Sequence, residues 1–299
     1  MPRAYVVLNP VAGSAEDDAR GDIEGHLAAH GWDCEVYETA GDEDVSALAR
    51  DAASNGFDLC VAAGGDGTAS AVAGGLVGTD VPLGILPVGT GNVLAQELGI
   101  PTEMEDALAL LTGDHETTAL DMIRVGDKHY VLNVSIGIGS LSMRDTKREW
   151  KQRYGMLAYA ATTIRVLLGF QPRRFRVTVD GREREIRASE VMVANSAAVG
   201  NPDVRLGTDV HLDDGRLDVC IIRARNLLDY LRVVWDVLLR RQDESRNVRC
   251  IPVNETVRIE TRRALPVNAD GEIIGDTPVE AALRRSAVQV VVPRNRERH

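Results

Sequence analysis

Apolar and polar positions follow two different patterns along the chain, and the change comes near residue 120. In the first part, short apolar runs alternate with stretches of helical periodicity, which is typical of a parallel sheet covered by helices. The expected strands are "AYVVLN", "CEVY", "DLCVAA" and "LGILPV", and helices are expected over about 15–30 and 45–53. The pattern predicts an α/β first domain over residues 1–120.

From residue 121 onward the pattern changes to strand-like runs separated by turn residues. These runs are "HYVLNVSIGIG", "RFRVTVDG", "EVMVAN", "RLDVCIIRA", "TVRIET" and "VQVVVP". Two amphipathic helical segments interrupt them, at residues 148–170 and 226–242. Many strands with few helices predict a mainly antiparallel, β-rich second domain over residues 121–286. Residues 287–299 form a last strand and tail that could return to the first domain.

Charge is divided unevenly between these two parts. The net charge is −11, but residues 1–120 hold 3 basic and 21 acidic residues, a net of −18, and the remainder carries +7. This asymmetry indicates different partners for the two parts, with an anionic surface for the basic one, although drift in surface composition is an equal alternative. Trp150 and Tyr154, flanked by cations, could insert at a membrane surface or pack into the second domain.

Composition favours a globular cytoplasmic protein. Hydrophobic residues make up 44% of the chain and charged residues 26%. The first residues lack the length and pattern of a signal peptide, and no uncharged apolar stretch is long enough for a membrane span. The cysteines are far apart and form no C-x-x-C pair, so small core residues in a reducing compartment are expected. They are Cys34, Cys60, Cys220 and Cys250.

Three candidate ligand-binding loops, each with at least one glycine, follow strands of the first domain. They are "NPVAGS", "GGDGT" and "PVGTGN", and in a parallel sheet they would lie together beyond the carboxyl ends of the strands. Glycine lets backbone N–H groups approach a ligand closely, and a helix N-terminus favours an anion. A phosphate is the expected ligand, and a tight turn without a ligand is the alternative for any single cluster.

Two familiar phosphate-binding motifs are missing from the sequence. There is no G-x-x-x-x-G-K-[ST] and no G-x-G-x-x-G, and the first lysine is Lys128. Phosphate binding would therefore depend on backbone N–H groups, the hydroxyls of Thr68 and Thr90, and a divalent cation. Because so acidic a domain repels a polyphosphate, magnesium is expected, with Asp66 as the carboxylate that reaches it.

These loops, in this order, resemble the catalytic domain of the diacylglycerol kinase and sphingosine kinase superfamily in its bacterial lipid kinase form. The likeness continues through "ALDMIRVG", "VLNVSIGIGS", "YGMLAYAATTIRVLL", "HLDDGRLDVCII", "LPVNADGE" and "VQVVVP", and so covers nearly the whole chain. It implies a two-domain kinase in which ATP and magnesium bind the first domain. The γ-phosphate would pass to a lipid hydroxyl, diacylglycerol-like or sphingoid-like, in the cleft between the domains. An NAD kinase-like enzyme and a catalytically silent nucleotide or lipid sensor are the alternatives.

The resemblance also assigns roles to individual residues. Glu272 of "DGE" matches the general base that takes the proton of the lipid hydroxyl. Asp66 matches a catalytic residue that holds magnesium through the nucleotide, and Asp121 matches an aspartate that supports the metal network. The matching nucleotide-binding positions are Asn9, Pro10, Val11, Ala12, Gly13, Thr39, Gly64, Gly65, Asp66, Gly67, Thr68, Gly89, Thr90, Gly91 and Asn92.

The resemblance also implies a second, structural magnesium site, and this chain departs from the family pattern at two positions. Asp214 of "LDDG" matches the carboxylate of that site, with the backbone carbonyls of His211 and Arg216. Many family members carry an aspartate where this chain has Val93, and an arginine where it has Gln96. An aspartate at the first position would help to hold the catalytic magnesium, so this half of the metal site, or the substrate subclass, differs here.

The segment "NADGE" has two interpretations. A lipid alcohol is a poor nucleophile, so a carboxylate within hydrogen-bond reach of it is expected. In an extended segment Asp270 and Glu272 would point to one face and could share this task. Alternatively, Asp-Gly forms an ordinary hairpin turn.

Overall fold

The structure is a computed structural model that describes residues 1–12, 18–145, 172–198, 205–206, 210–239 and 245–294. Gly13 lies outside these ranges, as do Trp150, Tyr154 and the whole of the expected helix at 148–170. None of the helices in the described ranges has the length and hydropathy needed to span a membrane.

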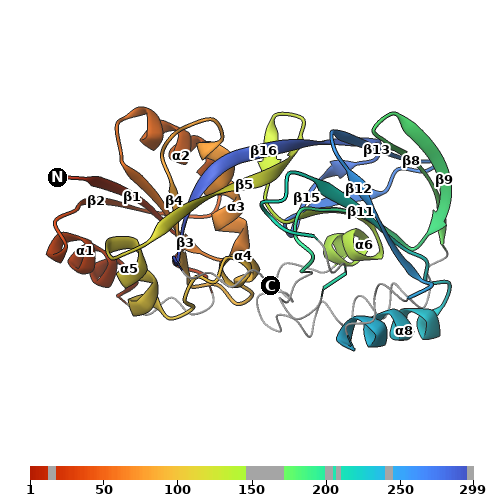
Figure 1. Cartoon of the computed structure of the whole chain (residues 1–299), viewed down its shortest axis with the longest axis horizontal. Helices are drawn as coiled ribbons and strands as arrows, with labels where there is room; N and C mark the ends of the chain where they lie inside the picture. The colour runs from red at the N-terminus through yellow and green to blue at the C-terminus, as the bar shows by residue number, and fades with distance from the viewer. Residues whose placement is uncertain (13–17, 146–171, 199–204, 207–209, 240–244, 295–299) are drawn as a thin grey trace.

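The first domain is a parallel sheet covered on both faces by helices, as predicted (Figure 1). The strands β2, β1, β3 and β4 are neighbours in that order, and all three pairs are parallel. The elements are β1 (Arg3–Leu8), α1 (Ala19–Ala29), β2 (Asp33–Glu38), α2 (Val45–Ser54), β3 (Leu59–Gly64), α3 (Asp66–Leu76), β4 (Leu83–Pro87), α4 (Val93–Glu97) and α5 (Met104–Thr112).

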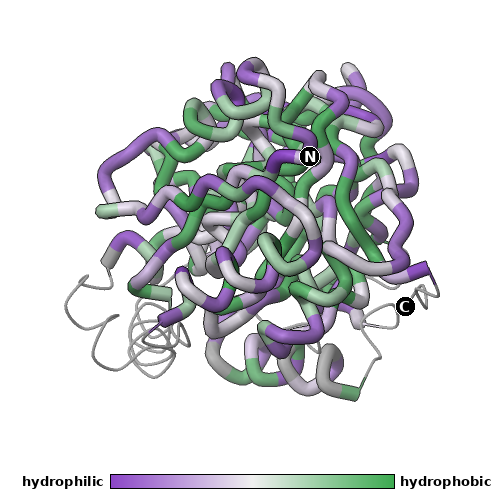
Figure 2. Tube along the Cα trace, turned by 90° about the vertical axis from the view of Figure 1, so that its left-hand side faces the viewer, coloured by the Kyte–Doolittle hydropathy of each residue, from purple (hydrophilic) through white to green (hydrophobic). Residues whose placement is uncertain are grey.

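Two apolar layers hold the helices on this sheet. Helices α1 and α5 cover one face through buried side chains such as Ile23, Leu27 and Leu108. Helices α2, α3 and α4 cover the other face, where Ala49 and Leu76 are buried. Figure 2 shows hydrophobic stretches concentrated in the interior strands and hydrophilic stretches at the surface. With both faces covered, the carboxyl ends of the strands and the loops that follow them are left for a ligand.

The second domain is a sandwich of antiparallel strands, also as predicted. One sheet has the order β12, β11, β10, β7, β14 and β15, and its inner face packs on β16, β13 and β8 of the other sheet. The elements are β5 (Glu116–Val125), β6 (Lys128–Tyr130), β7 (Asn133–Gly137), α6 (Ile138–Asp145), β8 (Arg173–Val179), β9 (Arg182–Ala188), β10 (Glu190–Ala194), β11 (Leu217–Ile222), α8 (Leu227–Leu238), β12 (Val248–Val253), β13 (Thr256–Thr261), β14 (Pro266–Ala269), β15 (Glu272–Asp276) and β16 (Val279–Val292).

The two domains share one sheet. The long strand β16 pairs with β4 of the first domain at Val290 and with β13 of the second at Thr256. Strand β5 runs antiparallel beside it, and Figure 1 shows both strands crossing from one domain to the other. These continuous backbone ladders fix the glycine loops relative to the second domain.

Two elements differ from the sequence pattern for identifiable reasons. Strand β9, with sequence "REREIRA", is charged at most positions because it lies at the edge of the large sheet, where charge prevents edge-to-edge pairing. The run "SIGIG" does not stay extended. Gly137 has φ +143°, and a Cβ there would lie 2.3 Å from the Ser189 carbonyl oxygen. The chain therefore turns at this glycine and continues as α6.

The expectation that all four cysteines are separate core residues is wrong for one pair. Cys220 and Cys250 lie opposite each other in β11 and β12 and form a disulfide. Spacing along the chain hides this pairing, because α8 connects the two strands and the antiparallel register brings the residues together. Cys34 and Cys60 are free.

The carboxylate of Glu190, the first residue of β10, is buried against the start of α6. Its side chain is 6% exposed, and Oε2 accepts a hydrogen bond of 2.8 Å from the Gly139 backbone N–H. Burial raises the pKa of Glu190 to about 7, although hydrogen bonds from Gly139, Ile138 and Ser135 oppose the increase. The folded protein therefore holds this proton more tightly than the unfolded chain does.

Glu190→Gln is expected to remove a pH dependence of stability. The wild-type free energy of unfolding, relative to that of the variant, should fall by about 2–3 kcal/mol as pH rises from the ordinary pKa of 4.5 to about 7, and then stay level. The fall occurs because the folded state binds the extra proton in this range. Urea unfolding of the wild type and the variant across this pH range measures the effect. A constant difference between them would contradict the assignment.

Candidate active site

The N-terminus of α3 is open toward the glycine loops. Gly65 precedes the helix in an extended conformation and makes no side-chain capping hydrogen bond. The first N–H groups of a helix have no partner within the helix and carry partial positive charge. The sequence "GGDGT" thus places backbone donors where a phosphate can bind them.

The loops after β1, β3 and β4 meet at this point. The Asn9 side-chain amide lies 3.5 Å from the Thr68 hydroxyl, which joins the first loop to α3. The loop after β4 approaches so closely that a Cβ on Gly89 would lie 2.4 Å from the Gly65 Cα. Thr39 follows β2, and its backbone N–H donates to the Leu8 carbonyl at the end of β1. The structure therefore brings the expected nucleotide-binding segments together, apart from Gly13.

Side chains within the loop after β4 hold it in shape. Asn92 adopts a left-handed conformation, and its side-chain amide donates to the carbonyls of Pro87 and Gly89 at 2.9 and 2.8 Å. The Gln96 amide donates to the Gly91 carbonyl at 3.0 Å. Val93 is 2% exposed and belongs to the apolar core. The two positions that depart from the family pattern thus support the loop and the core.

Asp66 joins the two helices that begin at this edge. It is the first residue of α3, and its Oδ1 accepts a hydrogen bond of 2.9 Å from the Leu94 backbone N–H in α4. Its carboxylate therefore lies at the glycine loops, where magnesium would accompany a nucleotide if these loops bind one.

Gly89→Ala is expected to weaken ATP binding about tenfold or more, because a Cβ cannot fit against Gly65 without separating the two loops. Calorimetric titration with ATP and magnesium measures the change. Gly25→Ala is the control, since this glycine lies in α1 in an ordinary helical conformation and a Cβ there would contact nothing within 4 Å. Unchanged ATP affinity in the Gly89 variant would show that the close approach of the loops is not needed.

Asp270 and Glu272 do not share one face, contrary to the extended interpretation. Asp270 and Gly271 have φ values of +44° and +90°, and Ala269 pairs directly with Glu272. The residues "DG" therefore form the two-residue turn between β14 and β15, which is the alternative that the sequence left open. The two carboxylates consequently have different surroundings.

The Asp270 carboxylate is fully engaged in hydrogen bonds. It accepts from the Ser70 hydroxyl and from the backbone N–H groups of Val131, Leu132 and Asn133, the last three at 2.8, 3.0 and 2.8 Å. Burial raises the pKa of Asp270, and these hydrogen bonds oppose the increase. Asp270 thus fastens the hairpin to α3 and to the segment between β6 and β7.

Glu272 begins β15 and is exposed. The pKa of the Tyr130 phenol is raised by burial and then by the charges of Asp270 and Glu272, so Glu272 lies near Tyr130. Ser70 is four residues after Asp66, about 6 Å along the helix, and it donates to Asp270. The candidate base therefore lies on a hairpin that is hydrogen-bonded to α3, the helix that begins at the glycine loops.

Asp121 lies with the "LDDG" loop. It is 2% exposed, and its two oxygens accept from the backbone N–H groups of Gly215 and Ser286 at 2.6 and 2.8 Å. Burial raises the pKa of Asp121, and the charge of Asp214 adds to this. These contacts join β5, β16 and the loop around Asp214. The expected role of Asp121 in the active-site metal network stays a prediction.

The expected structural magnesium site has one carboxylate in place. Asp214 accepts from the Arg216 backbone N–H at 3.1 Å and pairs with the Arg216 guanidinium at 3.2 Å. Within the described residues, no three His, Cys, Asp or Glu side chains gather as a metal site. Backbone carbonyls, such as those expected of His211 and Arg216, would have to complete the coordination, so this site also stays a prediction.

Sequence reasoning missed Ser70 as a positioning residue. It is 4% exposed in α3, and its partner Asp270 lies 200 residues away. A lone hydroxyl within the apolar helical run "ASAVAGGL" was the available signal, because a buried polar group needs a partner.

Comparisons with known proteins agree with this arrangement. Residues 3–125 match the diacylglycerol kinase catalytic domain, and residues 133–292 match the YegS C-terminal NAD kinase beta sandwich-like domain. The diacylglycerol kinase of Bacillus subtilis (strain 168) is 30% identical over 99% of this chain and 98% of its own length. The diacylglycerol kinase of Mycobacterium tuberculosis is 30% identical over 98% of this chain and 96% of its own length.

Solved structures show the same fold. A crystal structure of a diacylglycerol kinase from Bacillus anthracis str. Sterne aligns with a TM-score of 0.78 at 24% identity, over 98% of this chain and 97% of that one. A second crystal structure from that organism aligns with a TM-score of 0.82 at 25% identity, over 98% of this chain and 95% of that one. With both domains matched in order and the glycine loops joined to the "DGE" hairpin, this chain belongs to the diacylglycerol kinase family of lipid kinases.

Proposed function

We propose that the protein transfers the γ-phosphate of ATP to the hydroxyl of a lipid in a magnesium-dependent reaction. The observation that carries the proposal is the contact between Ser70 and Asp270. It binds the hairpin of Glu272 to the helix whose N-terminus faces the glycine loops. The proposed phosphate site and the candidate base thereby lie on adjacent elements of the two domains.

The roles of the residues follow from the demands of phosphoryl transfer. The reaction needs donor and acceptor to be positioned and the charge on the transferring oxygens to be stabilised. Backbone N–H groups at the start of α3, with the hydroxyls of Thr68 and Thr90, would bind the phosphates. Magnesium would neutralise phosphate charge, which the acidic first domain cannot do, and Asp66 would hold it.

Glu272 would act on the acceptor. Its exposed position leaves the carboxylate accessible to a lipid hydroxyl, whereas Asp270 is occupied by its hydrogen bonds. As general base, Glu272 takes the proton of that hydroxyl as the oxygen attacks the γ-phosphate. Because ATP and a membrane lipid meet at the cytoplasmic face of a membrane, we place the protein in the cytoplasm, peripheral to that face.

A transfer assay tests the proposal. The protein is incubated with radiolabelled ATP and mixed micelles that contain a diacylglycerol, a monoacylglycerol, phosphatidylglycerol or a sphingoid base, and in a parallel reaction with NAD as the acceptor. We expect label in one lipid class, and its loss on chelation of magnesium. Label in NAD alone would support an NAD kinase-like enzyme instead, and saturable ATP binding without transfer to any acceptor would support a sensor. Either result would overturn the proposal.

A further inference from the structure

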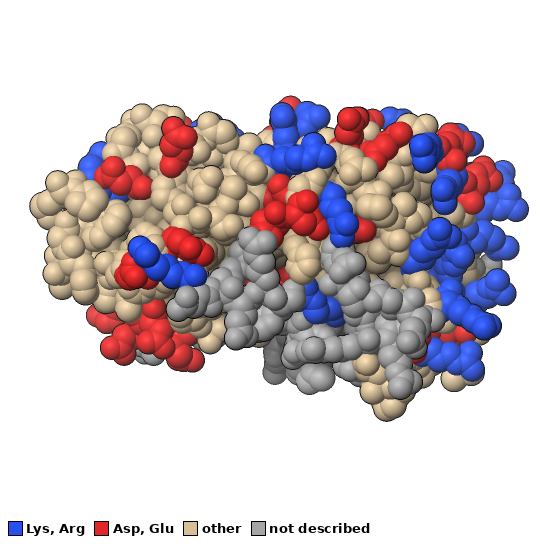
Figure 3. Space-filling model, viewed as in Figure 1, with Lys and Arg blue, Asp and Glu red and all other residues tan. Residues whose placement is uncertain are grey.

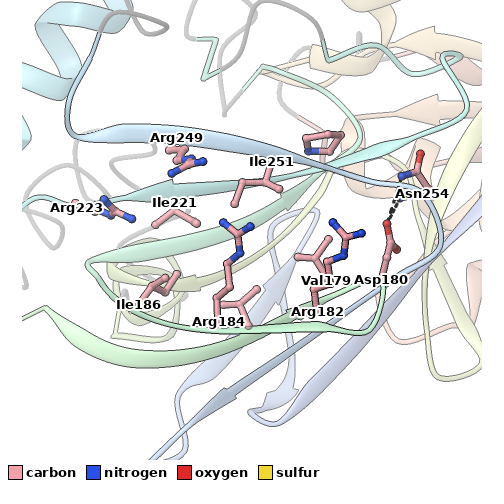
Figure 4. A pocket seen from close by; sticks show the side chains of 12 residues that line it. Val179, Asp180, Arg182, Arg184, Ile186, Ile221, Arg223, Arg249, Ile251 and Asn254 are labelled. Atoms are coloured by element: carbon pink, nitrogen blue, oxygen red, sulfur yellow. Dashed lines mark hydrogen bonds between the residues drawn. The ribbon is translucent and has the colours of Figure 1, made fainter.

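The second domain contains a pocket lined by arginines between the edges of its two sheets. The pocket has a volume of about 430 Å³ and lies between β8 and β9 on one side and β11 and β12 on the other. Arg182 and Arg184 come from β9, Arg249 from β12, and Arg223 follows β11. Figure 4 shows these four side chains around one space.

The four guanidinium groups have no acidic partner in the described part of the chain. The ion pairs of the described residues are formed by arginines outside the pocket, such as Arg176 and Arg258. The one carboxylate in the pocket wall, Asp180, is already engaged. It accepts hydrogen bonds from the backbone N–H groups of Asn254, Glu255 and Thr256. Four arginines and one carboxylate give the pocket an excess of positive charge, which favours an anionic ligand.

The base of the pocket is apolar. Ile186, Ile221 and Ile251 lie among the arginines (Figure 4). Planar guanidinium groups bind phosphate oxygens, and an apolar base suits the hydrocarbon that adjoins a lipid head group. A pocket that combines the two fits an amphiphile with an anionic head better than a free polyanion.

Helix α8 supplies an independent observation next to this pocket. It connects Arg223, at the end of β11, with Arg249 in β12. Four large apolar side chains on α8 and just after it are strongly exposed, at spacings that place them on one side of the helix. They are Leu228 (68% exposed), Leu231 (53%), Trp235 (63%) and Leu239 (47%). Leucine and tryptophan on one helix face are typical of helices that lie in a membrane interface.

Charge extends from the pocket across the same end of the molecule. Figure 3 shows Lys and Arg side chains gathered at the end of the second domain that is farthest from the first, reaching down toward α8. Apolar and basic groups therefore occur together there, as on surfaces that bind anionic lipids.

We propose that this end of the second domain docks on an anionic lipid bilayer. The α8 stripe, Leu228, Leu231, Trp235 and Leu239, enters the interface, and the arginine pocket binds the phosphate of an acidic head group. The site is separate from the candidate active site, because β12 and β15 are opposite edges of the six-stranded sheet. Its occupant is a bilayer lipid held by its phosphate and is distinct from the acceptor presented to Glu272.

Vesicle sedimentation of the full chain tests the proposal, and no turnover is needed. Wild-type protein should sediment with phosphatidylcholine vesicles that contain phosphatidylglycerol, and less as salt is raised. Arg184→Ala with Arg249→Ala should lower the partition coefficient about tenfold or more. Replacement of the same two residues by lysine should restore most of the binding. Leu231→Ser with Trp235→Ser should weaken binding and leave its salt dependence in place.

The charge-matched control is Arg50→Ala with Lys128→Ala, which removes two exposed cations outside the pocket and should change binding little. Thermal melting checks that each variant is folded. Equal losses in the control and the pocket variant would show that only net charge matters. No wild-type binding to anionic vesicles, or pocket-dependent binding of single-stranded RNA in preference to vesicles, would overturn the proposal. Because the assay measures binding alone, each outcome is independent of the proposed kinase activity.

Discussion

Glu272→Gln is expected to lower kcat by about 10²-fold or more while ATP affinity stays nearly unchanged. Glutamine keeps the shape of the side chain and can still form hydrogen bonds, but it cannot accept the proton of the lipid hydroxyl. ATP affinity should not change, because the protein groups proposed to bind ATP belong to the glycine loops and the start of α3. Steady-state kinetics with the lipid found in the transfer assay, and calorimetric titration with ATP, give the two quantities.

Glu255→Gln is a matched control, since Glu255 is another exposed glutamate of the second domain and should give wild-type kinetics. Near wild-type turnover in the Glu272 variant would remove this residue from the role of base. Asp270 would not replace it without rearrangement, because both of its oxygens already accept hydrogen bonds.

Asp270→Ala is expected to lower the free energy of unfolding by about 4 kcal/mol or more. The substitution leaves the N–H groups of Val131, Leu132 and Asn133 without their acceptor, at about 1–3 kcal/mol for each donor that stays buried. It also releases the Ser70 hydroxyl. Chemical unfolding followed by circular dichroism measures the loss.

Glu272→Ala is the control on the same hairpin and should leave stability within about 0.5 kcal/mol, because the side chain is exposed. Together the two variants separate a positioning role from a chemical one. If Asp270→Ala unfolded like wild type, the hairpin would not depend on this carboxylate for its place beside α3. Ser70→Ala should cause a smaller loss, since it removes one of the four donors.

The glycine loops were predictable because their signal is local. An apolar run, then "GGDGT", then a helical pattern specifies strand, turn and helix within a few residues, and parallel strands place their carboxyl ends together. The same holds for the helix at 45–53, observed as α2 over Val45–Ser54. Strand β9 was not predictable in this way, because an edge strand needs no apolar alternation along its length.

The hairpin at Asp270 shows where local reasoning failed. Asp-Gly indicated a turn, and the family resemblance indicated a site, but neither indicated the partners of the carboxylate. Ser70 and Val131 are 200 and 139 residues away along the chain. A two-residue difference in position then separates a half-buried carboxylate that positions the hairpin from an exposed one that is accessible to a substrate.

The sequence by itself determined the two-domain architecture, the position of the glycine loops and the family, because periodicity, turn chemistry and motif order are properties of short segments. Tertiary structure alone decided the pairing of Cys220 with Cys250, the attachment of the Glu272 hairpin to α3 and the convergence of Arg184 and Arg249 on one pocket. Each of these depends on strand register and sheet order, which join residues from distant parts of the chain. Such contacts arise when the apolar faces of whole sheets and helices pack together, so no short segment encodes them.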